Sequence, residues 1–182
     1  MGQTYPQVTE EIRRWVSAQK MFFVASAPLS SQGHINCSPK GADSFRILDE
    51  HMVCYLDLTG SGAETIAHLK ENGRIVIMFC AFDGPPRIVR FHGQGIVITE
   101  FSDEFTKFRK LFGSLEGVRA IITVKVTRVS SSCGFSVPLF DFKDHRDTLD
   151  KWAQRKGEEA LKEYRQKNNS LSIDGLPGFS EK

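Results

Sequence analysis

Hydrophobic and polar residues alternate along much of the first 130 positions in the manner of half-buried β-strands. Six stretches are rich in β-branched and aromatic residues and are bounded by Gly, Pro, Asp or Ser. They predict strands over residues 21–27, 34–40, 52–58, 74–82, 87–99 and 119–131. Pro39 predicts that the second strand lies at a sheet edge or that the proline lies at the strand's end, and Gly93 and Gly95 predict a bulge or bend in the fifth strand.

Helical spacing of apolar residues replaces this alternation at four places. It predicts a short helix that begins after Thr9, and helices over residues 63–72, 102–113 and 147–167. Gly73 is a C-terminal stop for the second helix, and Gly157 weakens the middle of the last. The third helix carries phenylalanines at helical spacing, which predict a face packed in the core: Phe101, Phe105, Phe108 and Phe112. Six strands joined mostly by short turns indicate an α+β barrel with antiparallel strands.

The length of 182 residues suits one domain with one core. Composition changes near residue 141, because residues 141–182 hold nine basic and nine acidic side chains, against 15 and 13 in the first 140. We therefore expect a barrel domain over residues 1–140. We expect residues 141–182 to form a C-terminal helix and tail that pack on the barrel or on a partner subunit.

Charge and apolar content exclude several classes of function. The net charge of +2 produces no strong basic field, so we expect no nucleic-acid partner. No apolar run approaches the roughly 20 residues of a membrane span, and the first 20 residues contain no apolar signal segment, so we expect no membrane association and a cytoplasmic location. Four widely spaced cysteines suit a reducing compartment. The histidines are scattered, so we expect no metal site.

The stretch from Thr59 to Thr65 (TGSGAET) carries the clearest chemistry, because it lies between a predicted strand and a predicted helix. Free amide groups at a helix N-terminus, with glycines that let a ligand approach, can bind an anion. The alternative is a flexible turn in which Ser61 caps the helix. Lys40, at the end of the second strand, is a second candidate that could neutralise a phosphate or lie in solvent. No arrangement of nucleophile, base and acid indicates hydrolysis, and no catalytic residue is predicted.

The order of several short motifs is also distinctive. Along the chain follow S-P-K-G (38–41), L-T (58–59), the Gly-Ser loop, E-N-G-R (71–74), I-V-I-M-F (75–79) and G-P-P-R (84–87). This order and spacing resembles the pyridoxamine 5′-phosphate oxidase-like family of FMN-binding split barrels. The resemblance covers roughly residues 10–130 and implies a six-stranded antiparallel split β-barrel with peripheral helices and a C-terminal helix.

By this resemblance, the protein is a homodimer that holds FMN between its subunits. The cofactor-binding residues that the resemblance and the Gly-rich loop imply are Ser38, Lys40, Thr59, Ser61, Gly62, Ala63, Glu64, Thr65 and Arg87. Glu64 and Thr65 stand where the oxidases carry an Arg-Lys pair for the phosphate, and Ile88 stands where they carry Gln. The oxidases' C-terminal R-x-H pair is not found, so oxidation of vitamin B6 is not expected.

The expected function is therefore that of an FMN-binding oxidoreductase acting on a small-molecule substrate, with NAD(P)H as a candidate electron donor. Two alternatives stay open. One is a non-catalytic flavin- or haem-binding protein, with His34, His68 or His92 as the axial ligand of a haem. The other is a reductase that uses the deazaflavin F420, as other split-barrel proteins do.

Overall fold

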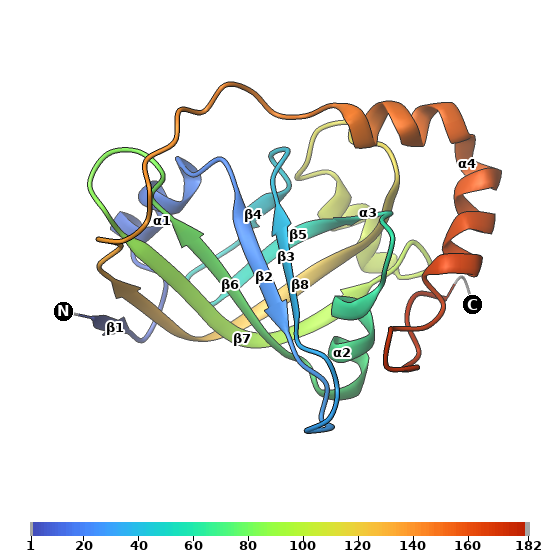
Figure 1. Cartoon of the computed structure of the whole chain (residues 1–182), viewed down its shortest axis with the longest axis horizontal. Helices are drawn as coiled ribbons and strands as arrows, with labels where there is room; N and C mark the ends of the chain where they lie inside the picture. Colours follow the sequence, from blue (N-terminus) through green and yellow to red (C-terminus); the bar gives the residue numbers. More distant parts are fainter. Residues whose placement is uncertain (1, 181–182) are drawn as a thin grey trace.

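The computed structural model describes residues 2–180, which form one curled β-sheet with helices around it (Figure 1). The strands are β1 (Gln3–Tyr5), β2 (Phe22–Ser26), β3 (Asn36–Lys40), β4 (Phe45–Ile47), β5 (Met52–Leu58), β6 (Arg74–Cys80), β7 (Ile88–Ile98) and β8 (Val118–Ser132). The helices are α1 (Glu10–Ser17), α2 (Glu64–Asn72), α3 (Asp103–Arg109) and α4 (Thr148–Asn168). None of these helices is both long and apolar enough to cross a membrane.

All neighbouring strands pair antiparallel, in the order β3-β2-β6-β7-β8-β5-β4, and β1 pairs with β8. The sheet curls into a half-barrel whose edge strands are β3 and β4, so the expected α+β split barrel is confirmed. The predicted irregularity is present, because the β7–β8 register shifts between His92 and Gly93. A Cβ atom on Gly93 would lie 2.2 Å from the carbonyl oxygen of Lys125, so only glycine fits there.

Each of the six predicted strands is present, but the count of six is too low. Strands β1 and β4 were not predicted, since each has only three residues, too few to show a period of two. Both pair with longer strands that the pattern did predict: β1 with β8 and β4 with β5.

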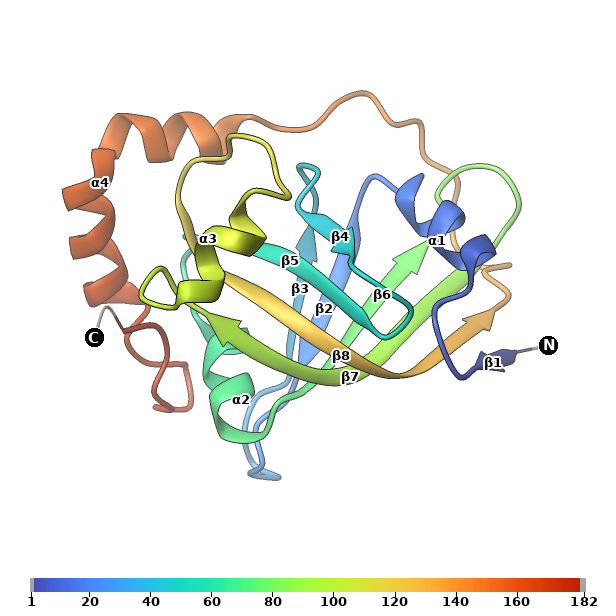
Figure 2. The ribbon, with the colours of Figure 1, turned by 180° about the vertical axis from the view of Figure 1, so that it is seen from behind.

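Aromatic rings fill the interior of the half-barrel. Phe22, Phe45, Phe79 and Phe91 lie in contact, with ring centroids 5.0–6.3 Å apart. The same core cluster includes side chains from α1 and α2, which lie at opposite ends of the curled sheet (Figures 1 and 2). Thr9 caps α1 as predicted, since its Oγ1 accepts a hydrogen bond from the Ile12 amide.

The face of α3 is less buried than the sequence pattern predicts. Phe112 is buried and Phe105 and Phe108 pack partly against a small second cluster, but Phe101 is 59% exposed. The prediction that these phenylalanines form one helix face packed in the core is therefore wrong for Phe101, which precedes the helix, because α3 spans only Asp103–Arg109. The helix face is also less buried because α3 packs against β8 at the side of the sheet and is not enclosed between elements (Figure 2).

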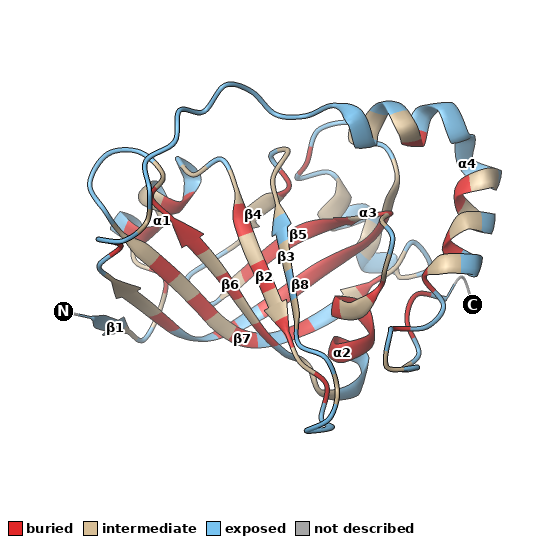
Figure 3. Cartoon of the chain, viewed as in Figure 1, coloured by how far each residue is buried: buried red, intermediate tan, exposed pale blue. Residues whose placement is uncertain are grey.

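The C-terminal region leaves the end of β8 as an extended linker that crosses over the half-barrel to α4 (Figure 1). Burial is sparse along the linker and along the start of α4, and increases near the end of the helix (Figure 3). At Gly157 the backbone has φ 72° and ψ 170°, a conformation nearly restricted to glycine, so α4 bends there. After α4 the tail turns back toward α2, and its Phe179 joins the main core.

Candidate functional site

The sheet is open where the end of β3 faces the second half of β5. Strand β4 pairs only with Val53–Tyr55 of β5. The following residues of β5, Leu56–Leu58, extend past the end of β4. At this opening Lys40 Nζ lies 3.1 Å from Asp57 Oδ1, and Arg119 Nε donates to Asp57 Oδ2 at 2.7 Å. Asp57 is fully buried and Arg119 is 95% buried, so one carboxylate holds two cations where the barrel is split.

The charge of Asp57 depends on these two partners. Burial alone would raise the pKa of its carboxyl, because desolvation disfavours the ionised form. The charges and hydrogen bonds of Lys40 and Arg119 outweigh that effect and hold the pKa below its ordinary value. Asp57 is therefore ionised near neutral pH, and the three side chains together carry a net charge of +1.

The Gly-rich loop leads from β5 to α2 beside this trio. Its carbonyl groups accept hydrogen bonds from two buried side chains: Gly62 O from Arg119, and Gly60 O from Asn169. Thr59 Oγ1 donates to Gly117 O and accepts from Arg165 Nε. The N-cap of α2 is Ala63, and no side chain caps the helix, so the alternative in which Ser61 is the cap is wrong.

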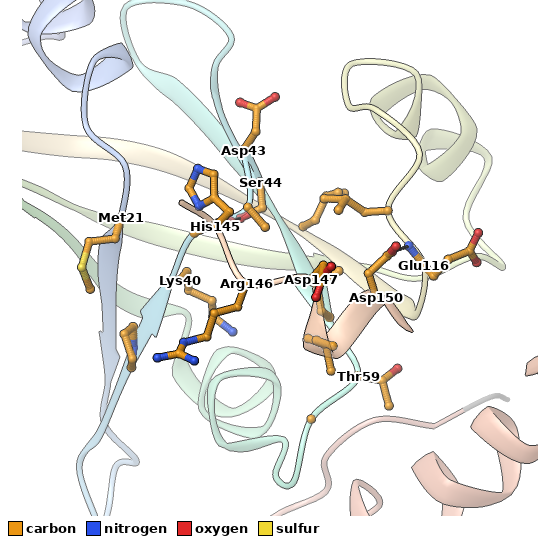
Figure 4. Close-up of a pocket in the computed structure, with 18 residues that line it drawn as sticks. Met21, Lys40, Asp43, Ser44, Thr59, Glu116, His145, Arg146, Asp147 and Asp150 are labelled. Carbon is orange, nitrogen blue, oxygen red and sulfur yellow. Dashed lines mark hydrogen bonds between the residues drawn. The ribbon is translucent and has the colours of Figure 1, made fainter. Parts of the chain in front are cut away.

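Two cavities meet at this loop. The smaller has a volume of about 250 Å³ and is lined by Asn36, Ser38, Lys40, Asp57, Leu58, Gly60, Ser61, Gly62, Glu64, Thr65 and Arg119. The larger, about 810 Å³, lies between the end of β3, the end of β5 and the start of α4 (Figure 4). The two share Lys40, Leu58 and Gly60, so they lie next to each other.

The larger cavity has mainly apolar walls, formed by Met21, Pro39, Leu56, Leu58, Leu115 and Leu149. Among its charged residues, Asp43 pairs with Arg46, and Asp147 with Lys151. Arg146 forms no hydrogen bond or ion pair with any residue in the part of the chain that the structure describes. Its side chain extends from the linker toward the Lys40 side of the cavity, whereas the carboxylates of Asp43 and Glu116 point away (Figure 4).

Two glycines leave the small cavity open. Neither Gly60 nor Gly62 has a left-handed backbone, and an added Cβ atom would come no nearer to a neighbour than 3.9 Å and 3.5 Å. The fold itself would therefore accept side chains at both positions. Their absence keeps space beside the trio and lets a ligand approach the loop.

The family model described as pyridoxamine 5′-phosphate oxidase matches residues 8–133. The chain belongs to this family. The resemblance seen in the sequence is thereby confirmed.

Within the pyridoxamine 5′-phosphate oxidase family, a curated relative is the family protein ustO of Aspergillus flavus. It is 42% identical over 194 residues, covering 96% of this chain and 77% of the relative. Two crystal structures of HupZ from Group A Streptococcus share the fold, with TM-scores of 0.57 and 0.54 and identities of 23% and 24%. They cover 69% and 66% of this chain, and 99% and 90% of their own.

The fold brings most of the predicted family site together. The small cavity is lined by six of the nine residues: Ser38, Lys40, Ser61, Gly62, Glu64 and Thr65. Thr59 lines the larger cavity, and Ala63 is fully buried at the start of α2. Arg87 lies elsewhere: its guanidinium pairs with Glu11, donates to Ser131 Oγ and packs over the Trp15 ring.

The histidines considered as haem ligands each have a different environment. His34 Nδ1 lies 2.6 Å from Asp174 Oδ1, and this hydrogen bond and the carboxylate charge raise the pKa of the imidazole. His68 is buried with Nδ1 2.9 Å from Ser26 Oγ. Burial and two nearby arginines lower the pKa of His92. Within residues 2–180, no group of three His, Cys, Asp or Glu side chains could hold a metal ion.

The residues that connect the site to distant parts of the chain are not predicted by the sequence pattern. Asp57 and Arg119 were not singled out, although a charged residue inside an apolar strand is rarely buried without a partner. That rule could have identified Asp57, which lies between Leu56 and Leu58. No comparable signal marks Asn169, because its contacts with Gly60 and Arg119 depend on how the tail folds back.

Proposed function

We propose that this protein binds FMN in the two adjacent cavities and acts as an FMN-dependent oxidoreductase on a small-molecule substrate. The observation that carries the proposal is that a polar cavity with a positive trio lies beside a larger apolar cavity, with Lys40 in the wall of both. FMN has a phosphate at one end and a flat ring at the other. A volume of about 810 Å³ lies within the range of roughly 300–1,000 Å³ typical of small-molecule sites.

The residues of this chain fit the two ends of such a ligand. Lys40, Ser61 and the amides at the start of α2 would hold the phosphate, since a helix N-terminus favours an anion. The apolar side chains of the larger cavity would surround the ring and exclude water, and Thr59 lies at the same wall. When bound, the flavin supplies hydride or electron transfer, and the protein supplies orientation and electrostatics.

We propose that the working form is a cytoplasmic homodimer, with NAD(P)H as its candidate electron donor. Support for a dimer comes from large apolar side chains of the linker that remain exposed in one chain: Phe135, Leu139, Phe140 and Phe142. Support for a reducing compartment comes from the four cysteines, which are all free thiols.

The proposal is tested by titrating the purified protein with FMN and recording absorbance and flavin fluorescence. We expect one FMN per chain, with a flavin band near ~450 nm that arises from the cofactor itself. Lys40→Ala should weaken FMN binding by about 1.5–3 kcal/mol, because it removes a charge-assisted phosphate contact. Lys110→Ala, which removes an exposed charge after α3, is the matched control and should bind FMN like the wild type.

A protein that takes up no FMN would contradict the proposal, and a Soret band in the spectrum of the protein as purified would favour the haem-binding alternative. If FMN binds, anaerobic addition of NADH or NADPH separates an enzyme from a carrier. Bleaching of the flavin band is expected for the oxidoreductase, and an unchanged band with both donors would contradict NAD(P)H as the electron donor.

A further inference from the structure

We propose that the small cavity is a phosphate-monoester site whose principal cation is Arg119, and that the C-terminal segment holds this arginine in place through Asn169. The inference rests on the proposed binding of FMN and adds to it two residues on distant parts of the chain. Arg119 belongs to β8, and Asn169 follows the end of α4.

Arg119 is oriented by three acceptors and still has donors available. Its Nε donates to Asp57, and its Nη1 donates to Gly62 O and to Asn169 Oδ1, both at 2.8 Å. Among residues 2–180, its Nη2 has no hydrogen-bond partner, and the side chain lines the small cavity. A nearly buried guanidinium with an unused nitrogen, in the wall of a cavity, is suited to an anion with several oxygen acceptors.

The two cations of the small cavity lie on one side of it, around Asp57. Lys40 and Arg119 face a single carboxylate on Asp57, which leaves the trio with a net charge of +1. The other carboxylate of the cavity wall, Glu64, accepts hydrogen bonds from the backbone amide of Ile173 in the tail. With Glu64 counted, the charged groups of the cavity wall sum to zero, so a phosphate monoester would be held by the donors of Arg119 and Lys40 and not by an excess of positive charge.

The C-terminal segment, residues 165–179, contacts this site at Arg119, the Gly-rich loop and Glu64. Asn169 is fully buried and bridges Arg119 to Gly60 O of the Gly-rich loop. Arg165 donates to Thr59 Oγ1 and packs over the Phe179 ring, and Lys70 of α2 donates to Gly178 O. A Cβ atom on Gly178 would lie 2.4 Å from Asn169 O. Glycine at this position therefore lets the backbone of the tail pass close to the backbone of Asn169.

The test compares two ligands that differ only in the phosphate. Dissociation constants of FMN and riboflavin are measured by fluorescence for the wild type, Arg119→Gln and the control Arg128→Gln, which changes an exposed arginine of the same strand. We expect the wild type and Arg128→Gln to prefer FMN by at least about tenfold, and Arg119→Gln to lose FMN affinity by a similar factor while riboflavin binding changes little.

A structural role alone would weaken both flavins equally, so an unchanged preference for FMN in Arg119→Gln would overturn the proposal. Asn169→Asp provides a second variant should Arg119→Gln fail to fold. It keeps an oxygen acceptor for Arg119 but adds a negative charge beside the phosphate position. We expect it to lower the preference for FMN as well, whereas Asn168→Asp, one residue earlier, should leave the preference unchanged.

Different experimental results would contradict the proposed function and this inference. If the wild type binds neither flavin, the proposed function is wrong. The anion site is then tested with inorganic phosphate alone. Phosphate should raise the melting temperature of the wild type above that in chloride of equal ionic strength, and should raise it less in Arg119→Gln. An equal rise in both proteins would overturn the phosphate site.

Discussion

Asp57 is the residue on which both cations of the small cavity depend. It is buried in β5 and bonded to Lys40 on β3 and Arg119 on β8, so it joins strands on both sides of the split. Its pKa is lowered in the folded protein, and its contribution to stability is therefore present above the ordinary pKa of the carboxyl and lost as pH falls through the lowered value. Near neutral pH the interaction is complete.

Replacement of Asp57 by Asn should leave two cations close together with no compensating charge. We expect Asp57→Asn to reduce the free energy of unfolding by roughly 3–5 kcal/mol, the usual cost of breaking a buried ion pair. The measurement is urea denaturation at pH 7 with and without phosphate. Bound phosphate should restore more stability in the variant than in the wild type, since it replaces the missing charge.

The control is Asp43→Asn, because Asp43 forms an exposed ion pair with Arg46. Exposed pairs contribute about 0–1 kcal/mol, so this variant should unfold nearly as the wild type does. A loss of stability in Asp57→Asn no larger than that of Asp43→Asn would contradict the role given to Asp57.

At the level of elements, the tail after α4 is held against the β2–β3 hairpin by a titratable contact. The Asp174 carboxylate accepts hydrogen bonds from the backbone amide and the imidazole of His34. These bonds raise the pKa of His34 above 6.5 and lower the pKa of Asp174 below 3.8. The contribution of His34 is complete below 6.5 and is lost as pH rises through the raised pKa, and that of Asp174 is lost as pH falls through the lowered one.

Docking of the tail should therefore be strongest in mildly acidic solution and weaken above the raised pKa of His34. Hydrogen exchange of a peptide spanning residues 170–180, corrected for the intrinsic rate, measures this docking between pH 6 and pH 8.5. Protection should decrease with pH in the wild type, whereas Asp174→Asn should show the weaker protection throughout and little dependence on pH. Protection of α1 serves as the internal reference, and a pH-independent tail in the wild type would refute the prediction.

The elements also show what a single sequence can and cannot predict here. The long strands β5–β8 were predictable because burial on one or both faces gives each a run of apolar residues. The Gly-rich loop and Lys40 were predictable because their chemistry is local to a strand end. Arg119 and Asn169 were not, since they are 50 residues apart and meet only after the tail has folded against the Gly-rich loop.

At the scale of the whole molecule, two groups stand out among the 14 phenylalanines. Those on β2, β4, β6 and β7 form much of the core inside the half-barrel. Phe135, Phe140 and Phe142, on the linker that crosses over the half-barrel, are more than half exposed. Within the proposed homodimer, this linker is the surface that a second chain would cover, and it lies beside the larger cavity, whose wall includes His145 and Arg146.

The most direct test of the account is a crystal structure of the protein grown with FMN. The account predicts one FMN per chain, with its phosphate in hydrogen-bond contact with Arg119, Lys40 and the start of α2, and with its ring in the larger cavity. A structure without bound flavin, or with the FMN phosphate away from the Gly-rich loop, would contradict it.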